Sequence, residues 1–242
     1  MQYFGYGPQE LAILENILLH YLKEGDCYVD IGAHMGQELI PASRKVGASG
    51  TCYGFEPNPY VRASLDEKIK NLSIKNIKTS GCAVYSHNCT QELEVPKNCT
   101  GSELSTFIQE VKSRFYYTRC FEDAIKVTCA CVSLDDFFAD AKKIDFIKID
   151  AQGAEPYILK GAAGILDKFH PILLMEWEEF PDEWAVESYN LLQKLEYKVF
   201  DINQFNKPCL SINDYLPSQI PDKRTNLLCL PSNVALYNPF AD

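Results

Sequence analysis

The fold is determined by the stretch Tyr28-Val29-Asp30-Ile31-Gly32-Ala33-His34-Met35-Gly36-Gln37-Glu38. Its first residues favour a β-strand, and Gly32 and Gly36 allow a tight turn in which the main chain can approach a bulky group closely. Asp30 places a carboxylate at the carboxyl end of the predicted strand, which is the edge where open α/β sheets bind ligands. The stretch therefore predicts a strand, a glycine turn and a helix that together bind a ligand.

Length and charge limit the functional classes. The chain has 242 residues, of which 46% are hydrophobic and 23% charged, so it can bury a sizeable core within one domain. Its 23 basic and 33 acidic residues give a net charge of −10. A dedicated nucleic-acid-binding protein needs a basic surface for phosphates, so we expect no nucleic-acid partner.

The ten cysteines are scattered along the chain without a C-x-x-C pair or an accompanying histidine cluster. A metal site is therefore not expected, and the thiols are interpreted as small apolar side chains. The first residues, Met1-Gln2-Tyr3-Phe4-Gly5-Tyr6, lack the basic and apolar regions of a signal peptide, and no apolar run reaches the ~18 residues of a membrane span. Together these features predict a cytoplasmic protein with reduced thiols and no membrane span.

Predicted strands and helices alternate along most of the chain, which is typical of a mostly parallel sheet covered by helices on both faces. Apolar and β-branched runs predict strands at 27–31, 51–55, 77–85, 90–95, 127–132, 145–150, 171–177, 198–201 and 225–230. Helical spacing and helix-start or helix-stop residues predict helices at 8–22, 37–46, 60–71, 155–160 and 184–195, with a further helix beginning at Ser133.

Two segments lie outside this alternation. Residues 1–25 are expected to form an N-terminal helical segment. Residues 96–126 are polar and aromatic, and they are too many for a simple turn, so they are predicted to be an insertion that serves as an acceptor-side lid.

Four predicted strands end in a carboxylate at what should be one edge of the sheet: Asp30, Glu56, Asp150 and Glu176. Glu56 follows Gly36 by 20 residues (56 − 36), the spacing at which an acidic residue binds the ribose hydroxyls of a nucleotide cofactor. Both carboxylate oxygens can accept a hydroxyl hydrogen at the same time. This edge therefore predicts a nucleoside site.

Two cofactor classes fit such an edge. A dinucleotide site normally has three glycines in the pattern G-x-G-x-x-G, but here the turn contains only Gly32 and Gly36, with His34 between them. Asp30 and Asp150 would also repel a pyrophosphate, whereas they would attract a sulfonium. The residues favour S-adenosylmethionine, and a nicotinamide-dependent oxidoreductase is the alternative.

Five blocks of sequence resemble the FkbM-type methyltransferase family, in the order in which that family has them. The blocks are Val29-Asp30-Ile31-Gly32-Ala33-His34-Met35-Gly36, Phe55-Glu56-Pro57-Asn58-Pro59, Val132-Ser133-Leu134-Asp135-Asp136, Ile147-Lys148-Ile149-Asp150-Ala151-Gln152-Gly153-Ala154-Glu155 and Pro171-Ile172-Leu173-Leu174-Met175-Glu176. The resemblance implies one class I methyltransferase domain over residues 1–242, an α/β Rossmann-like three-layer sandwich with a mostly parallel, seven-stranded sheet. It also implies S-adenosylmethionine as donor and a hydroxyl acceptor on a sugar, glycan or natural product.

The resemblance also implies positions for the donor. Asp30, Gly32 and Gly36 would line its methionine part, Glu56 would bind ribose, and Asp150 would lie beside the transferring methyl. Further residues of the implied donor site are Ala33, His34 and Pro57, with Cys82 and Ala83 beside the adenine.

A hydroxyl acceptor needs a base that removes its proton as the new bond forms. The candidates are Asp150, Glu155 and Glu176, followed by Glu178 and the more remote His87. Glu155 could instead stabilise the start of a helix. This chain has His34 where the family commonly has asparagine, and Gln152 where glutamate is common, which removes one further candidate base. Methylation of nitrogen on another acceptor class and a non-catalytic S-adenosylmethionine-binding module are the alternative functions.

Overall fold

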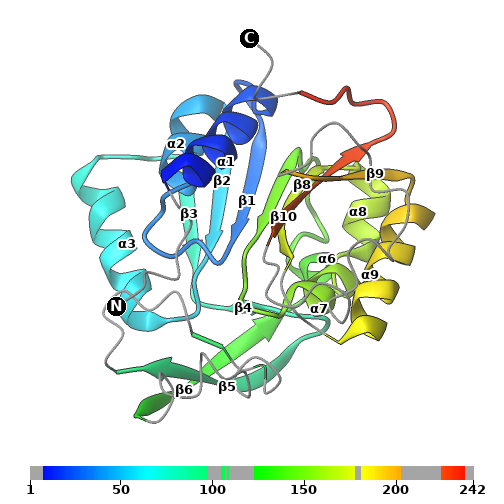
Figure 1. The fold of residues 1–242 in the computed structure, drawn as a ribbon. Coiled ribbons are helices and arrows are strands. Elements are labelled where there is room, and N and C mark those ends of the chain that lie inside the picture. Colours follow the sequence, from blue (N-terminus) through cyan, green and yellow to red (C-terminus); the bar gives the residue numbers. More distant parts are fainter. Residues whose placement is uncertain are drawn as a thin grey trace.

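The computed structural model describes residues 8–97, 105, 106, 108, 123–177, 181–202 and 225–237. Within them, a seven-stranded sheet forms the centre of the molecule, with helices on both faces (Figure 1). The α/β class and the mostly parallel seven-stranded sheet expected from the sequence are confirmed. The strands of this sheet are β1 (Cys27–Ile31), β2 (Thr51–Phe55), β3 (Ile77–Ser80), β7 (Phe146–Ile149), β8 (Ile172–Trp177), β9 (Tyr197–Asp201) and β10 (Thr225–Pro231).

The strand order is β3-β2-β1-β7-β8-β10-β9, and β10 is antiparallel to both of its neighbours. From β1 the chain moves outward through β2 to β3, and it later returns to the other side of β1 as β7. This reversal between β1 and β7 is a topological switch point, where the loops after the two strands diverge and open α/β sheets bind ligands.

The two faces of the sheet pack against different helices. Alternate residues of β1 and β7 point to opposite faces, so Val29 and Ile147 join one apolar cluster while Tyr28 and Phe146 join the other. Side chains of α1 to α3 fill the Tyr28 face, and side chains of α6 to α9 fill the Val29 face, which gives the three-layer arrangement. These helices are α1 (Pro8–Tyr21), α2 (Leu39–Val46), α3 (Pro59–Asn71), α6 (Leu134–Phe137), α7 (Glu155–Lys160), α8 (Ala163–Phe169) and α9 (Asp182–Lys194).

One prediction of secondary structure was wrong. Residues 77–85 were expected to form one strand, but they divide into β3 and β4 (Ala83–Val84), which belong to different sheets. Residues 77–80 pair with β2, whereas Ala83 and Val84 pair with β6 (Ala124–Val132). The chain changes partner around Gly81, because a second sheet is available beyond the end of β3. The short helix α8 was also missed.

The second sheet has the order β4-β6-β5, where β5 spans Cys89–Pro96. It lies beyond the carboxyl ends of the main-sheet strands (Figure 1). In the β5–β6 ladder Pro96 pairs with Ala124, so residues 97–123 connect two antiparallel neighbours. The predicted insertion, 96–126, therefore begins and ends within this hairpin, because Pro96 belongs to β5 and residues 124–126 belong to β6.

Among the described residues no helix is long and apolar enough to cross a membrane. The seven cysteines in the described ranges are free thiols, and most of them are buried.

Candidate functional site

The turn after β1 has the backbone conformation that its glycines predict. Gly32 and Gly36 have φ values of +79° and +75°, and His34 between them also lies in the left-handed region, at 44°. A Cβ atom on Gly32 would lie 1.7 Å from the main-chain oxygen of Asp150. The turn after β1 thus packs directly against the end of β7, and only glycine fits between them.

Glu56 follows β2 and holds this turn in place. Its Oε2 accepts a hydrogen bond from the His34 main-chain N–H at 2.9 Å, and its Oε1 accepts one from the Asn58 N–H at 2.9 Å. Burial raises the pKa of Glu56, while the two hydrogen bonds oppose that rise. Each oxygen keeps a second lone pair, so the carboxylate can still accept two hydroxyl hydrogens of a ribose.

The predicted row of carboxylates is present at one edge of the sheet. Glu56 and Asp150 directly follow β2 and β7, and Asp30 and Glu176 are the next-to-last residues of β1 and β8. The four strands are consecutive in the strand order β2-β1-β7-β8. Asp30 and Glu176 are almost fully buried, at 0% and 1% exposure. Buried carboxylates need cations or hydrogen-bond donors nearby.

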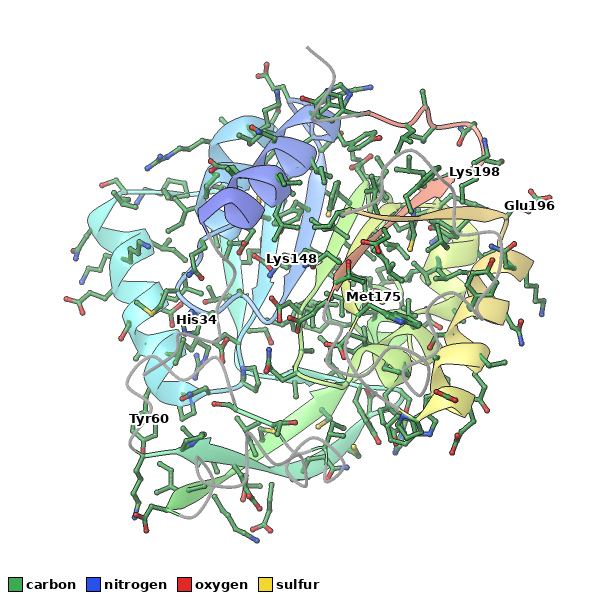
Figure 2. All side chains as sticks on the ribbon, viewed as in Figure 1. His34, Tyr60, Lys148, Met175, Glu196 and Lys198 are labelled. Atoms are coloured by element: carbon green, nitrogen blue, oxygen red, sulfur yellow. The ribbon has the colours of Figure 1, made fainter. Side chains whose placement is uncertain are left out.

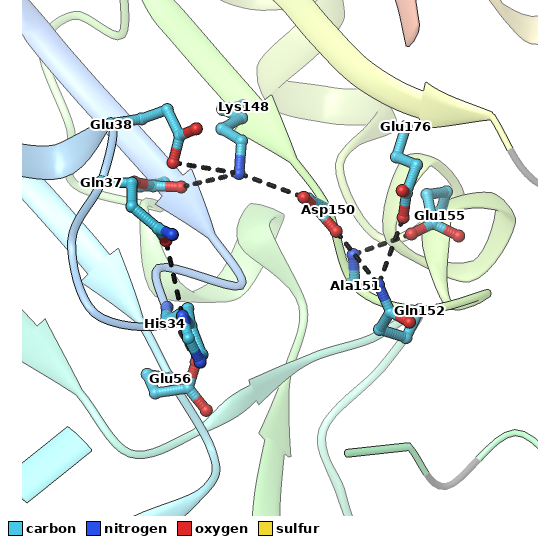
Figure 3. A network of polar contacts seen from close by, with 11 residues as sticks. His34, Gln37, Glu38, Glu56, Lys148, Asp150, Ala151, Gln152, Glu155 and Glu176 are labelled. Carbon is cyan, nitrogen blue, oxygen red and sulfur yellow. Dashed lines mark hydrogen bonds and ion pairs between the residues drawn. The ribbon is translucent and has the colours of Figure 1, made fainter. Parts of the chain in front are cut away.

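The cation in this row is Lys148, which the sequence analysis missed. Its Nζ lies 3.4 Å from Oδ2 of Asp150, 3.7 Å from Oε2 of Glu38 and 3.8 Å from Oδ1 of Asp30. Figure 3 shows Lys148 between Glu38 and Asp150, and Figure 2 places it near the middle of the main sheet. A lysine in the otherwise apolar strand Phe146–Ile149 is the signal that could have identified it.

The charges of this cluster influence one another. Burial raises the pKa of Asp30 to about 7; the positive charge of Lys148 opposes this shift, and the carboxylates of Glu38 and Asp150 add to it. Burial disfavours the ammonium of Lys148, but Glu38, Asp150 and Asp30 outweigh this effect and raise its pKa above the usual range. Lys148 is therefore permanently charged at physiological pH.

Gln152 connects the β7 and β8 ends of the row. Its Nε2 donates to Oδ1 of Asp150 and to Oε2 of Glu176, both at 3.4 Å (Figure 3). Its backbone has a φ of +52°, which is uncommon for a residue with a side chain and is often found at functional sites. The turn after β7 thus places one neutral amide between two acidic side chains.

Glu155 is fully buried, and its Oε1 accepts a hydrogen bond from the main-chain N–H of Ala151 at 2.8 Å. This contact fixes the turn that follows Asp150, at the beginning of α7. This geometry is consistent with the second interpretation of Glu155 from the sequence, in which it stabilises the start of a helix instead of acting as a base.

The other predicted donor-site residues lie around this row. Ala33 is buried in the core beneath the turn, and Pro57 follows Glu56 directly. Cys82 lies between β3 and β4, next to the Ser80 carbonyl that accepts the Glu56 N–H at 3.0 Å. Ala83 instead points into the core of the second sheet. Three sets of residues lie outside the described residues: 1–7 of the predicted N-terminal segment, 98–104, 107 and 109–122 of the predicted insertion, and the candidate base Glu178.

Two described residues of the predicted insertion reach the same edge. The amide of Asn58 donates to Oγ of Ser105 at 3.1 Å, and the hydroxyl of Thr106 donates to the main-chain oxygen of Gln152 at 3.2 Å. Residues 105 and 106 therefore link the loop after β2 to the turn after β7. The link spans both strand ends expected to contact the donor.

The residues of this edge fit S-adenosylmethionine. A turn restricted to glycine at position 32, a carboxylate with free lone pairs at Glu56 and a cluster with excess negative charge suit a nucleoside bearing a cationic sulfonium. Among the described residues no group of acidic, histidine and cysteine side chains could hold a metal ion.

Comparisons with known proteins agree with this description. A family model described as "Methyltransferase FkbM domain" matches residues 30–202. "Methyltransferase sdnD" from Sordaria araneosa is 27% identical over 203 residues, which are 73% of this chain and 74% of that protein.

Two solved structures align with this chain. An rRNA methylase from Streptococcus thermophilus aligns with a TM-score of 0.51 at 11% identity, over 94% of this chain and 99% of that chain. A methyltransferase FkbM from Methylobacillus flagellatus aligns with a TM-score of 0.47 at 16% identity and covers 86% of this chain. The present chain spans 44% of the length of that FkbM structure.

Proposed function

The chain belongs to the FkbM methyltransferase family and is a methyltransferase that uses S-adenosylmethionine, and on this basis we propose that it methylates a hydroxyl group of a sugar, glycan or natural product. The proposal has two parts, which are the residues that bind the donor and the residues that prepare the acceptor. The observation that carries it is the row of four carboxylates across β2, β1, β7 and β8.

The donor part of the proposal uses the β2 and β1 ends of the row. Glu56 would accept the ribose hydroxyls, and the turn containing Gly32 and Gly36 would hold the methionine part with main-chain groups. Cys82, which lies beside the same edge, would border the adenine. When bound, S-adenosylmethionine supplies an electrophilic methyl group.

The acceptor part follows from the strand order. If the donor occupies the β2 and β1 ends, the acceptor must approach from the β7 and β8 side, where Asp150, Gln152 and Glu176 lie. A hydroxyl becomes a good nucleophile only as its proton leaves, and a buried carboxylate on that side can accept the proton.

Among the three candidate bases, we favour Glu176, because β8 is the strand of the row farthest from the proposed donor end. Asp150 is in contact with the ammonium of Lys148 through one oxygen and accepts from Gln152 through the other, so the protein engages both of its oxygens. Glu155 accepts the Ala151 N–H at the start of α7. Glu176 contacts the neutral amide of Gln152, so we propose that Oε1 or Oε2 of Glu176 receives the acceptor proton.

Other acceptor classes remain as alternatives. Methylation of nitrogen in a nucleic acid would require a basic surface, which the net charge of −10 disfavours. The rRNA methylase that shares the fold is only 11% identical, so its name does not bear on the acceptor. A non-catalytic donor-binding module would retain Glu56 and the glycine turn without using Glu176.

The donor part is tested by titration calorimetry with S-adenosylhomocysteine, for which we expect a micromolar dissociation constant. The acceptor part is tested by transfer of radiolabelled methyl groups to a panel of sugars, polyols and phenols on one side and amines on the other. Turnover only with amines would contradict hydroxyl methylation. Glu176→Gln should abolish turnover while S-adenosylhomocysteine still binds, and an active Glu176→Gln variant would exclude Glu176 as the base.

A further inference from the structure

We propose that Lys148 is a positioning residue that sets the charge of the donor site, so that the site distinguishes the cationic donor S-adenosylmethionine from its neutral product S-adenosylhomocysteine. This inference rests on the donor site proposed above and adds to it a residue and a role. Lys148 acts through the carboxylates that it holds and need not touch the donor itself.

The geometry around Lys148 brings together three separate parts of the fold. Asp30 comes from the neighbouring strand and is its partner in the parallel ladder, Glu38 stands at the start of α2, and Asp150 follows the strand of Lys148 itself. The three ion pairs measure between 3.4 and 3.8 Å, and the Lys148 side chain is only 5% exposed. One ammonium therefore bridges three carboxylates, of which Asp30 is fully buried while Glu38 and Asp150 are partly exposed.

Other charged and titratable groups face the same cluster. Glu176, on the next strand, adds a fourth negative charge to the surroundings of Lys148. The hydroxyl of Tyr28 lies on the same face of β1 as Asp30, and burial strongly raises the pKa of Tyr28, which keeps it neutral. The excess charge of the cluster is thus negative on every side.

Charge counting shows what Lys148 contributes. When only the three carboxylates that pair with Lys148 are counted, and Glu176 is left aside, three ionised carboxylates and one ammonium give −3 + 1 = −2. A bound sulfonium reduces this excess to −1, whereas the neutral thioether of the product leaves it unchanged. The cluster therefore favours the donor over the product, but only while its carboxylates are ionised.

Without Lys148 the same carboxylates would face one another unscreened in a buried site. Three carboxylates grouped around one point in a buried site cannot all remain ionised once the ammonium between them is removed. Some of them would therefore retain protons at neutral pH. The sulfonium of S-adenosylmethionine could then gain from these carboxylates only after they lose their protons. The preference for S-adenosylmethionine would therefore appear at a higher pH than in the wild type. Lys148 sets the pH at which the site becomes selective.

The experiment compares dissociation constants for S-adenosylmethionine and S-adenosylhomocysteine between pH 5.5 and 9, measured by calorimetry on the full chain. In the wild type, the preference for S-adenosylmethionine should rise with pH through one midpoint. In Lys148→Met this midpoint should move up by about one pH unit or more, and the plateau at high pH should be higher because the positive charge is gone.

Lys143→Met is the matched control. Lys143 also bridges two carboxylates, Asp145 at 3.0 Å and Asp26 at 3.4 Å, but it lies at the amino ends of the strands, away from the donor edge. Its replacement should leave the midpoint unchanged. An unmoved midpoint in Lys148→Met, or an equal loss of both affinities at every pH, would overturn the proposal.

A second variant keeps the test valid if Lys148→Met does not fold. Glu38→Gln removes one negative charge from the partly exposed rim of the cluster, so the midpoint should move down and the plateau should become lower. Lys148→Arg keeps the positive charge and should retain the wild-type midpoint. If the midpoint of Glu38→Gln equals that of the wild type, the cluster does not control selectivity.

The outcomes separate this inference from the proposed donor site. A wild-type protein that binds neither compound would refute the donor site itself. A wild-type protein that binds both, with midpoints that no charge variant moves, would refute only the role of Lys148.

Discussion

The ammonium of Lys148 lies 3.4 Å from Oδ2 of Asp150, while Oδ1 of the same carboxylate accepts a hydrogen bond from Gln152 at 3.4 Å. Both oxygens of the aspartate expected beside the transferring methyl are therefore engaged by the protein (Figure 3). The orientation of this carboxylate is therefore set by two contacts from the protein. This arrangement orients Asp150 before any ligand binds.

Replacement of Glu56 by glutamine should weaken the binding of S-adenosylhomocysteine by about 10- to 100-fold, because hydrogen bonds to a charged group contribute about 1.5–3 kcal/mol. Calorimetry measures the change directly. Glu92→Gln is a suitable control, because Glu92 forms an exposed ion pair with Lys126 on the second sheet. Equal affinities in the two variants would contradict the assignment of Glu56 to the ribose.

Replacement of Gly32 by alanine should destabilise the fold by about 3 kcal/mol or more, because the new Cβ would collide with the Asp150 main-chain oxygen. Urea unfolding measures the loss. Gly25→Ala provides a matched comparison, since Gly25 has a similar φ of +86° but its Cβ would meet only Ser49 Oγ, at 3.6 Å. Gly25→Ala should cost about 1 kcal/mol from backbone strain alone. Similar losses of unfolding free energy in both variants would show that the collision with the Asp150 oxygen adds nothing to the backbone strain.

The raised pKa of Asp30 predicts a pH dependence of stability. Its folded-state pKa is about 7, compared with an ordinary value of 3.8, so between these pH values the folded protein binds a proton more strongly than the unfolded chain does. The contribution of Asp30 to stability should therefore decrease as pH rises from about 4 to about 7 and then remain level.

Asp30→Asn isolates this contribution. Between pH 5 and pH 8 the wild type should lose about 1–3 kcal/mol more of its unfolding free energy than Asp30→Asn does. Urea unfolding at the two pH values measures the difference. Asp66→Asn, at an exposed ion pair with Arg62, should behave like the wild type. Parallel curves for the wild type and Asp30→Asn would contradict the raised pKa.

Replacement of Gln152 by glutamate should destabilise the protein as pH rises. The new carboxylate would lie between Asp150 and Glu176 and would replace the amide that donates to both. We expect a loss of about 1–3 kcal/mol at pH 8 and a smaller loss at pH 5.5, where carboxylates can share protons. Gln193→Glu, on α9, also removes an amide donor, in this case to the Tyr197 carbonyl, and it lies outside the row of carboxylates, so its loss should depend less on pH. Thermal unfolding at both pH values compares the two variants.

The sequence predicted the elements that local chemistry specifies. The turn from Gly32 to Gly36 follows from the glycines themselves, because few other residues adopt left-handed backbone conformations. The helix expected to begin at Ser133 behaved similarly, because the Ser133 side chain accepts the Asp136 N–H within three residues along the chain. Glu56 was identified because its distance from Gly36 along the chain reflects one strand–helix–strand unit.

Contacts between distant segments could not be read in the same way. The division of residues 77–85 between two sheets depends on β6, which begins about 40 residues later and offers Ala83 and Val84 new partners. Lys148 looked like one polar residue in an apolar strand, and only the alignment of β7 beside β1 shows that it faces Asp30. Glu38 joins them because α2 begins at the same edge.

By itself, then, the sequence determined the family, the donor class and the row of acidic strand ends, because each depends on residue types at short, fixed spacings. Only the tertiary structure decided how these charges are balanced. Lys148 contacts carboxylates that are 118 and 110 positions earlier in the chain (148 − 30 and 148 − 38), and no local pattern encodes such a pairing. Strand order and burial create that cluster.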